Sequence, residues 1–141
     1  MTSASQVHAF YAGEPAAGMD NDRHAIIACG DSLLIVVADG AQGRPGGDAA
    51  EFIVSHFRSE SNSMSGWLSS HSWVSELRAL DSKLRQASHG GLTTGVVALV
   101  RSALVVGASV GDSEAHLFDP GGGGVDLSEH QRGAAIMQVS T

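Results

Sequence analysis

One acidic residue at the end of an apolar run is the part of this sequence best suited to chemistry. Residues 33–38 are all apolar, and Asp39 and Gly40 follow them directly. A run of this kind predicts a strand that is buried on both faces, which would hold the carboxylate of Asp39 in a fixed position at its end. Carboxylates held in this way serve as metal ligands and catalytic acids. An Asp-Gly pair is also a common turn, so this segment alone leaves a plain turn open.

Candidate polar groups also border two later apolar runs. Thr93 and Thr94 stand before the first run, and Gly111 and Asp112 come directly after the second. We interpret the two threonines as structural hydroxyls close to the site. For Asp112 two interpretations stay open: a turn acid that caps a backbone N–H group, or a ligand of a cation.

These three motifs occur in the order typical of one enzyme family. They read Asp39-Gly40-Ala41-Gln42-Gly43, Leu92-Thr93-Thr94 and Val110-Gly111-Asp112-Ser113-Glu114. The set resembles the metal-dependent protein phosphatases (PPM, type 2C), which carry Asp-Gly-x-Gly-Gly, then Gly-Thr-Thr, then Val-Gly-Asp-Ser-Arg. The resemblance covers about residues 20–118. It implies that the chain corresponds to the N-terminal half of the family's domain.

The resemblance also implies a fold. Members have an α+β, αββα sandwich, in which two central antiparallel sheets pack face to face and pairs of helices cover the outside. We therefore expect residues 1–141 to form a single, partial PPM-type domain with two outer helices. The order of the expected elements, with two strands, then two helices, then at least three strands, agrees with an α+β arrangement.

By resemblance, Asp39, Gly40, Asp22 and Asp112 have roles in a metal site. Asp39 would bridge two Mn²⁺ or Mg²⁺ ions, and Gly40 would offer its backbone carbonyl to one of them. Asp112 would help to bind a further, weaker ion, and Asp22 would hold metal-bound water through a hydrogen bond. The implied activity is hydrolysis of phosphoserine and phosphothreonine in phosphoprotein substrates by metal-activated water, without a covalent intermediate.

Two departures from the family pattern leave a second function open. Members place an arginine for the substrate phosphate a few residues before Asp22, where this chain has Ala16, Ala17 and Gly18. The later Asp-Gly and Asp-Asn pairs that complete the metal site in members do not occur after Glu114. The alternative is a non-catalytic pseudophosphatase or a phosphoprotein-binding remnant.

Arg23 and Arg44 are the nearby cations that could replace this arginine. We interpret both as solvated surface charges, which is the common state of such side chains. Asn21 is a milder departure, because members have Glu or Gln at this place.

The elements that position these residues follow from the spacing of apolar side chains. In chain order, we expect strands over 24–29 and 32–38, a helix from 48 to about 60, a polar loop over 59–65, a second helix from about 67 to 90, strands on both sides of Arg101-Ser102, and a strand over 114–118. Residues 1–20 are expected to form a loosely ordered arm with one short strand near 7–11, and residues 119–141 a glycine-rich turn and tail.

The amino-acid composition limits the kinds of partner and compartment that we expect for this chain. The formal net charge of the 141 residues is −7 and the eight basic residues form no cluster, which argues against nucleic acid or a membrane surface as a partner. Cys29 is the single cysteine, so a reducing compartment such as the cytoplasm is expected. No run approaches the roughly 20 apolar residues of a membrane helix. Because half a sandwich leaves apolar strands such as 33–38 uncovered, self-association is also expected.

Overall fold

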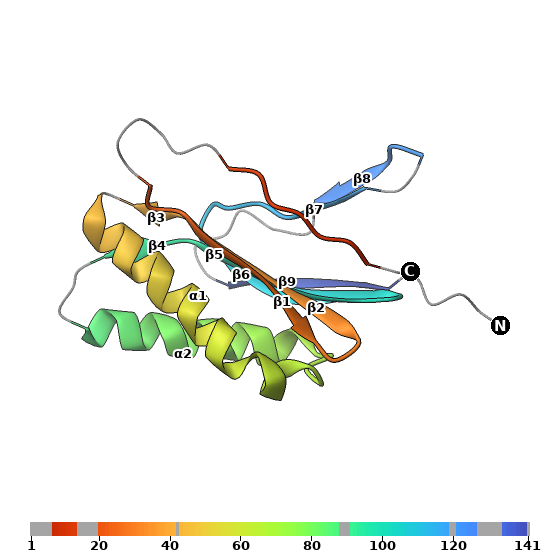
Figure 1. Cartoon of the computed structure of the whole chain (residues 1–141), viewed down its shortest axis with the longest axis horizontal. Coiled ribbons are helices and arrows are strands. Elements are labelled where there is room, and N and C mark those ends of the chain that lie inside the picture. The colour runs from red at the N-terminus through yellow and green to blue at the C-terminus, as the bar shows by residue number, and fades with distance from the viewer. Residues whose placement is uncertain are drawn as a thin grey trace.

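One antiparallel sheet and two helices dominate the computed structural model, which describes residues 7–13, 20–41, 43–87, 91–118, 121–126 and 134–140 (Figure 1). The sheet has five strands in the order β1-β2-β5-β6-β9. Their bounds are β1 Arg23–Cys29, β2 Ser32–Ala38, β5 Gly95–Arg101, β6 Leu104–Val110 and β9 Ala134–Ser140. Helices α1 (Arg44–Met64) and α2 (Ser70–Gln86) cover the same face of this sheet. The predicted α+β class is therefore confirmed.

The first two strands form the predicted hairpin. Its turn contains Gly30 at a φ of 61°, a left-handed conformation that glycine adopts with little steric cost. In β1 and β2, side chains alternate between the two faces of the sheet. Ala25, Leu34 and Val36 face the helices and are buried, as the apolar run before Asp39 predicts.

Helix α1 is longer than the sequence predicts. It begins at Arg44 rather than Asp48 and continues to Met64, through the segment predicted to be a polar loop. The hydroxyls of Ser59, Ser61 and Ser63 each donate a hydrogen bond to the backbone carbonyl three residues earlier. Serine satisfies its own hydroxyl within a helix in this way, so a serine-rich composition did not mark a break here.

The core lies between the helices and the sheet. The largest fully buried side chains include Trp73, Phe57, Leu34 and Leu80. The indole N–H of Trp73 donates to a backbone carbonyl at 2.9 Å, so its one polar group is satisfied. Burial also raises the pKa of the Cys29 thiol, which keeps this cysteine protonated and unreactive.

The C-terminal segment differs from the predicted turn and tail. Within it, β8 (Gly124–Asp126) pairs with β7 (His116–Phe118), and β9 pairs with β6 along its whole length. Residues 134–137 are apolar, which is compatible with a strand. The glycines at 121–124 led to the prediction of a turn and tail instead. The expected tail therefore supplies the edge strand of the main sheet.

The expected strand near residues 7–11 is wrong, because residues 7–13 have no regular secondary structure. The ring of Tyr11 stacks on that of His24, with centroids 3.4 Å apart, so this segment contacts β1. The rest of the predicted arm, apart from Asp20, lies outside the described residues.

The face of the sheet opposite the helices is also apolar. It carries Ile26 and Val37, which keep 38% and 37% of their surface exposed. Residues 7–13 and the β7-β8 pair lie on this side (Figure 1). Within the described ranges no second large sheet covers the face, so the structure shows one half of the predicted sandwich. In the same ranges neither helix is long and apolar enough to cross a membrane.

Candidate functional site

The predicted acids gather at one end of the main sheet. Asp22 directly precedes β1 and Asp39 directly follows β2, and Arg23 lies opposite Ala38 in the register of this pair. After Asp39 the chain enters β3 (Gly40–Ala41), which pairs with β4 (Leu92–Thr93). The strand end that the sequence predicts for Asp39 is therefore confirmed.

The backbone of Asp39 is fixed by both threonines. The Asp39 N–H donates to the Thr94 hydroxyl at 3.1 Å. The Asp39 carbonyl accepts from the Thr94 N–H and from the Thr93 hydroxyl, both at 2.9 Å. With its N–H and carbonyl bonded, Asp39 has little backbone freedom, while the residue as a whole is exposed to solvent. The backbone that carries this carboxylate is therefore held in a defined position.

The surroundings of Asp39 make ionisation of its carboxyl group less favourable than in water. Burial raises the pKa of Asp39, and a side-chain hydrogen bond with Asp22 and the negative charges of Asp22 and Asp112 raise it further. Asp22 and Asp112 therefore both act on Asp39 at this end of the sheet. A cation beside them would remove the repulsion that raises the pKa.

The residues on either side of Asp112, Gly111 and Ser113, both contact Thr94. Gly111 has a φ of 94°, and a Cβ atom placed on it would lie 2.9 Å from Cγ2 of Thr94, so the turn packs directly on this threonine. The hydroxyl of Ser113 lies 2.5 Å from the hydroxyl of Thr94. The loop that carries Asp112 is thus attached to the residue that holds Asp39.

Close backbone packing explains the glycines around Asp39. A Cβ atom at Gly40 would lie 2.4 Å from the carbonyl oxygen of Gly46 and 2.7 Å from that of Asn21. A Cβ atom at Gly46 would lie 1.9 Å from the carbonyl oxygen of Ala41. Any other residue at these positions would push the start of α1 away from Asp39. The glycines therefore bring helix, strand end and Asn21 together.

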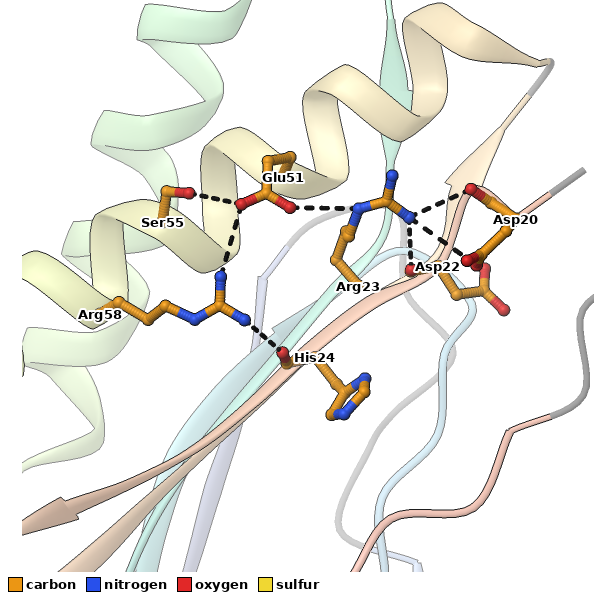
Figure 2. A network of polar contacts seen from close by, with 7 residues as sticks. All are labelled: Asp20, Asp22, Arg23, His24, Glu51, Ser55 and Arg58. Atoms are coloured by element: carbon orange, nitrogen blue, oxygen red, sulfur yellow. Dashed lines mark hydrogen bonds and ion pairs between the residues drawn. The ribbon is translucent and has the colours of Figure 1, made fainter.

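A network of charged groups fixes the backbone of Asp22 (Figure 2). The Arg23 guanidinium donates to the carbonyl oxygens of Asp22 at 2.8 Å and Asp20 at 3.1 Å. Its Nε donates to Glu51 of α1 at 3.1 Å. Arg58 donates to the same carboxylate at 3.4 Å and to the backbone carbonyl of His24 at 3.1 Å. The start of β1 is in this way attached to α1.

Sequence reasoning missed this network, because it treated Arg23 as a solvated surface charge. The spacing of Glu51, Ser55 and Arg58 along α1 places them on one face of the helix, and this was the available signal. The partners of that face on β1, Arg23 and the carbonyl of His24, are known only once α1 is packed on β1. Since Arg23 is engaged in this way, it is not a free replacement for the family's phosphate-binding arginine.

A hollow of about 360 Å³ lies between residues 20–23 and the start of α1. Its lining residues are Asp20, Asn21, Arg23, Gly43, Arg44, Gly47 and Asp48. Both Arg23 and Arg44 line this hollow.

The residues present fit a divalent ion only in part. Hard ions prefer carboxylate and carbonyl oxygens, which the predicted ligands Asp39, Asp112 and Gly40 supply. In the described ranges, however, no group of three or more His, Cys, Asp or Glu side chains is placed to hold a metal ion. The described residues therefore supply only some of the ligands that a two-metal site needs.

Comparison with known proteins identifies the fold. No family model and no curated protein sequence matches the chain. A bacterial serine phosphatase that carries a point mutation gives a TM-score of 0.66 at 20% identity, over 86% of this chain and 64% of that protein. Serine/threonine phosphatase Stp1 from Staphylococcus aureus gives 0.64 at 23% identity, over 83% of this chain and 51% of that protein. The chain has a PPM-type phosphatase fold.

A structure from work on the bacterial stressosome also shares this phosphatase fold. Its TM-score is 0.62 at 15% identity, over 90% of this chain and 67% of that protein. The predicted family resemblance is thus confirmed at the level of the fold. The chain spans 64% and 51% of the length of the two phosphatases.

Proposed function

We propose that this chain is part of a metal-dependent serine/threonine phosphoprotein phosphatase domain. The observation that carries the proposal is the meeting of Asp22 and Asp39 at the end of the sheet, with the charge of Asp112 close enough to act on Asp39. The fold, which serine phosphatases share, supports the same reaction class. The reaction would be hydrolysis of a phosphate monoester by water.

Asp39 and the carbonyl of Gly40 would hold Mn²⁺ or Mg²⁺, and Asp112 a further, weaker ion. A divalent ion supplies charge neutralisation for the phosphoryl group and lowers the pKa of water. The backbone hydrogen bonds at Asp39 would keep its carboxylate in place, and Asp22 would orient water by a hydrogen bond. Asp39 and Asp22 are therefore the proposed catalytic acids.

The proposed substrates are proteins that carry phosphoserine or phosphothreonine. The formal net charge of −7 opposes nucleic acid and anionic membranes as partners. Arg44, which begins α1 and lines the hollow between this helix and residues 20–23, is the proposed contact for the substrate phosphate. Cys29 is the single cysteine and cannot form a disulfide within the chain, which agrees with a proposed place in the cytoplasm.

The test is Mn²⁺-dependent hydrolysis of p-nitrophenyl phosphate and of a phosphothreonine peptide. Wild type, Asp39→Ala and Asp81→Ala would be compared, because Asp81 is an exposed acid on α2 that takes no part in the site. We expect activity in wild type and Asp81→Ala that needs Mn²⁺ and that Asp39→Ala lacks. Equal rates in wild type and Asp39→Ala would contradict the proposal.

One observation favours the non-catalytic alternative. In the described ranges the site has fewer than three side-chain ligands for a metal, and Arg23 is occupied by Glu51 and two carbonyls. A pseudophosphatase would bind the phosphothreonine peptide without releasing phosphate. Fluorescence anisotropy of a labelled peptide, measured beside phosphate release, separates the two functions.

A further inference from the structure

The hydroxyl of Thr94 lies between the loops that carry Asp39 and Asp112. It accepts a hydrogen bond from the Asp39 N–H at 3.1 Å. The same oxygen lies 2.5 Å from the hydroxyl oxygen of Ser113, the residue after Asp112. A threonine hydroxyl has one donor and two acceptor positions, so it can make both bonds at once. One side chain therefore joins the two acidic loops.

We propose that Thr94 is a positioning residue that couples these loops, so that the placement of Asp39 depends on the Asp112 loop through Ser113. Thr94 acts through the backbone of Asp39 and does not itself need to touch a metal or a substrate. Under the proposed function, the coupling would make the binding of a cation at Asp39 sensitive to the position of Asp112. The inference rests on that function only for its consequence in metal binding.

Packing holds the Thr94 side chain in this orientation. The turn at Gly111 lies against its methyl group, where a Cβ atom at Gly111 would come within 2.9 Å of Cγ2. A β-branched side chain has restricted rotation about χ1, so contact on the methyl side fixes the direction of the hydroxyl. Thr94 and Ser113 are both half-buried, which reduces competition from water for the bond between them.

Thr93 offers a matched comparison. Its hydroxyl directs its single hydrogen toward two backbone carbonyls, those of Asp39 and Thr94, each at 2.9 Å, rather than toward Ser113. Loss of the Thr93 hydroxyl should therefore disturb Asp39 without removing the connection to the Asp112 loop. Variants of the two threonines therefore distinguish two effects: loss of a hydrogen bond to Asp39, and loss of the connection between the two loops.

The experiment combines two measurements on Thr94→Val, Thr94→Ser, Thr93→Val, Ser113→Ala and the Ser113→Ala doubles with each valine variant. The first is the NMR resonance and hydrogen exchange of the Asp39 amide in the metal-free chain. The second is Mn²⁺ affinity by calorimetry. We expect Ser113→Ala to shift the Asp39 amide and to weaken Mn²⁺ binding about threefold. Thr94→Val should weaken binding by about five- to tenfold, the change produced by loss of one or two hydrogen bonds, and speed exchange at Asp39.

The decisive result is the pattern of the double variants. Adding Ser113→Ala to Thr94→Val should have no further effect, whereas adding it to Thr93→Val should have its full effect. Thr94→Ser should resemble wild type. An Asp39 amide that does not respond to Ser113→Ala, or additive effects of Thr94→Val and Ser113→Ala, would overturn the inference. A chain that binds no Mn²⁺ would instead overturn the proposed metal site, and the Asp39 amide would still decide the coupling.

Discussion

Asp22 and Asp39 flank the paired ends of two neighbouring strands, because Arg23 and Ala38 lie opposite each other where β1 begins and β2 ends. The register of the hairpin alone brings the two carboxyl groups together. Since the sheet and the bonds to Thr94 fix the backbone at Asp39, the acids cannot easily move apart to reduce their repulsion. Binding of a cation between the two carboxylates would relieve this repulsion.

The first prediction concerns the metal-free protein. The raised pKa of Asp39 means that its charged form is disfavoured in the folded state, so folding takes up protons at pH values between the usual 3.8 and the raised value. Stability should therefore fall as pH rises through this window. Asp39→Asn should remove that loss and stabilise the metal-free chain at pH 7 by at most about 1 kcal/mol, because an exposed carboxylate is screened by solvent.

Thermal unfolding in EDTA at several pH values checks this prediction. The difference between Asp39→Asn and wild type should shrink below the usual pKa of 3.8, where Asp39 is protonated in both states. Added Mn²⁺ should stabilise wild type and leave Asp39→Asn unchanged. A variant that is less stable than wild type at pH 7 in EDTA would show that Asp22 and Asp39 do not repel each other as described.

The second prediction tests the close packing at Gly40. Gly40→Ala places a Cβ atom 2.4 Å from the carbonyl oxygen of Gly46, and both groups belong to backbone that cannot rotate away. We expect a loss of about 1–3 kcal/mol in the free energy of unfolding. Gly66→Ala is the control, since a Cβ atom there meets nothing within 4 Å. Urea denaturation that finds equal stability for both variants would contradict the packing.

The third prediction concerns the carboxylate that joins Arg23 and Arg58. Glu51→Gln keeps the shape of the side chain but removes the charge that both guanidinium groups share. Partly exposed ion pairs contribute little individually, so we expect a loss of about 0.5–1 kcal/mol for the two together. Asp81→Asn, which breaks an exposed pair with Arg85 within α2, should change stability by less than about 0.5 kcal/mol.

Chemical denaturation of these two variants measures the difference. A second readout is the Asp22 amide resonance, which should shift in Glu51→Gln because Arg23 also bonds to the Asp22 carbonyl. If Asp81→Asn is as destabilising as Glu51→Gln, the network contributes nothing beyond an ordinary surface pair.

The elements nearest Asp39 were predictable because their signals are local. The apolar run of β2 and the Asp-Gly pair after it require no knowledge of the rest of the chain. The end of α1 was not predictable in the same way, since Ser61 and Met64 extend the helix only because the core covers them. Propensity is a weak guide where packing supplies most of the stability of a helix.

The candidate site likewise contains residues that local motifs predict and residues that only the tertiary packing reveals. Asp22, Asp39 and Asp112 follow from motifs within short segments, whereas the roles of Glu51 and Arg58 depend on how α1 lies against β1. Likewise, the hydroxyls of Thr94 and Ser113 meet only after two strands and a turn are in place. The spacing of apolar residues predicts one helix or strand at a time, so it cannot predict contacts between residues that are far apart in the sequence.

The fourth prediction concerns the apolar face opposite the helices. Its side chains on β1, β2 and β5 include Ile26, Ile35 and Val37 and carry no formal charge at pH 7, while the chain as a whole has a net charge of −7. Two copies that meet through this face would bury apolar surface. We therefore propose that the chain self-associates through it, with light scattering showing a mass that rises with concentration.

A pair of lysine variants locates the contact. Ile26→Lys on the sheet and Phe52→Lys on α1 change side chains of equal exposure, 38% each, on opposite sides of the molecule. A buried, unpaired charge opposes association, so Ile26→Lys should shift the chain toward the monomer while Phe52→Lys should not. A wild-type chain that stays monomeric at all concentrations would contradict self-association. If only Phe52→Lys dissociates the chain, the contact between copies lies on the helical side and not on the sheet.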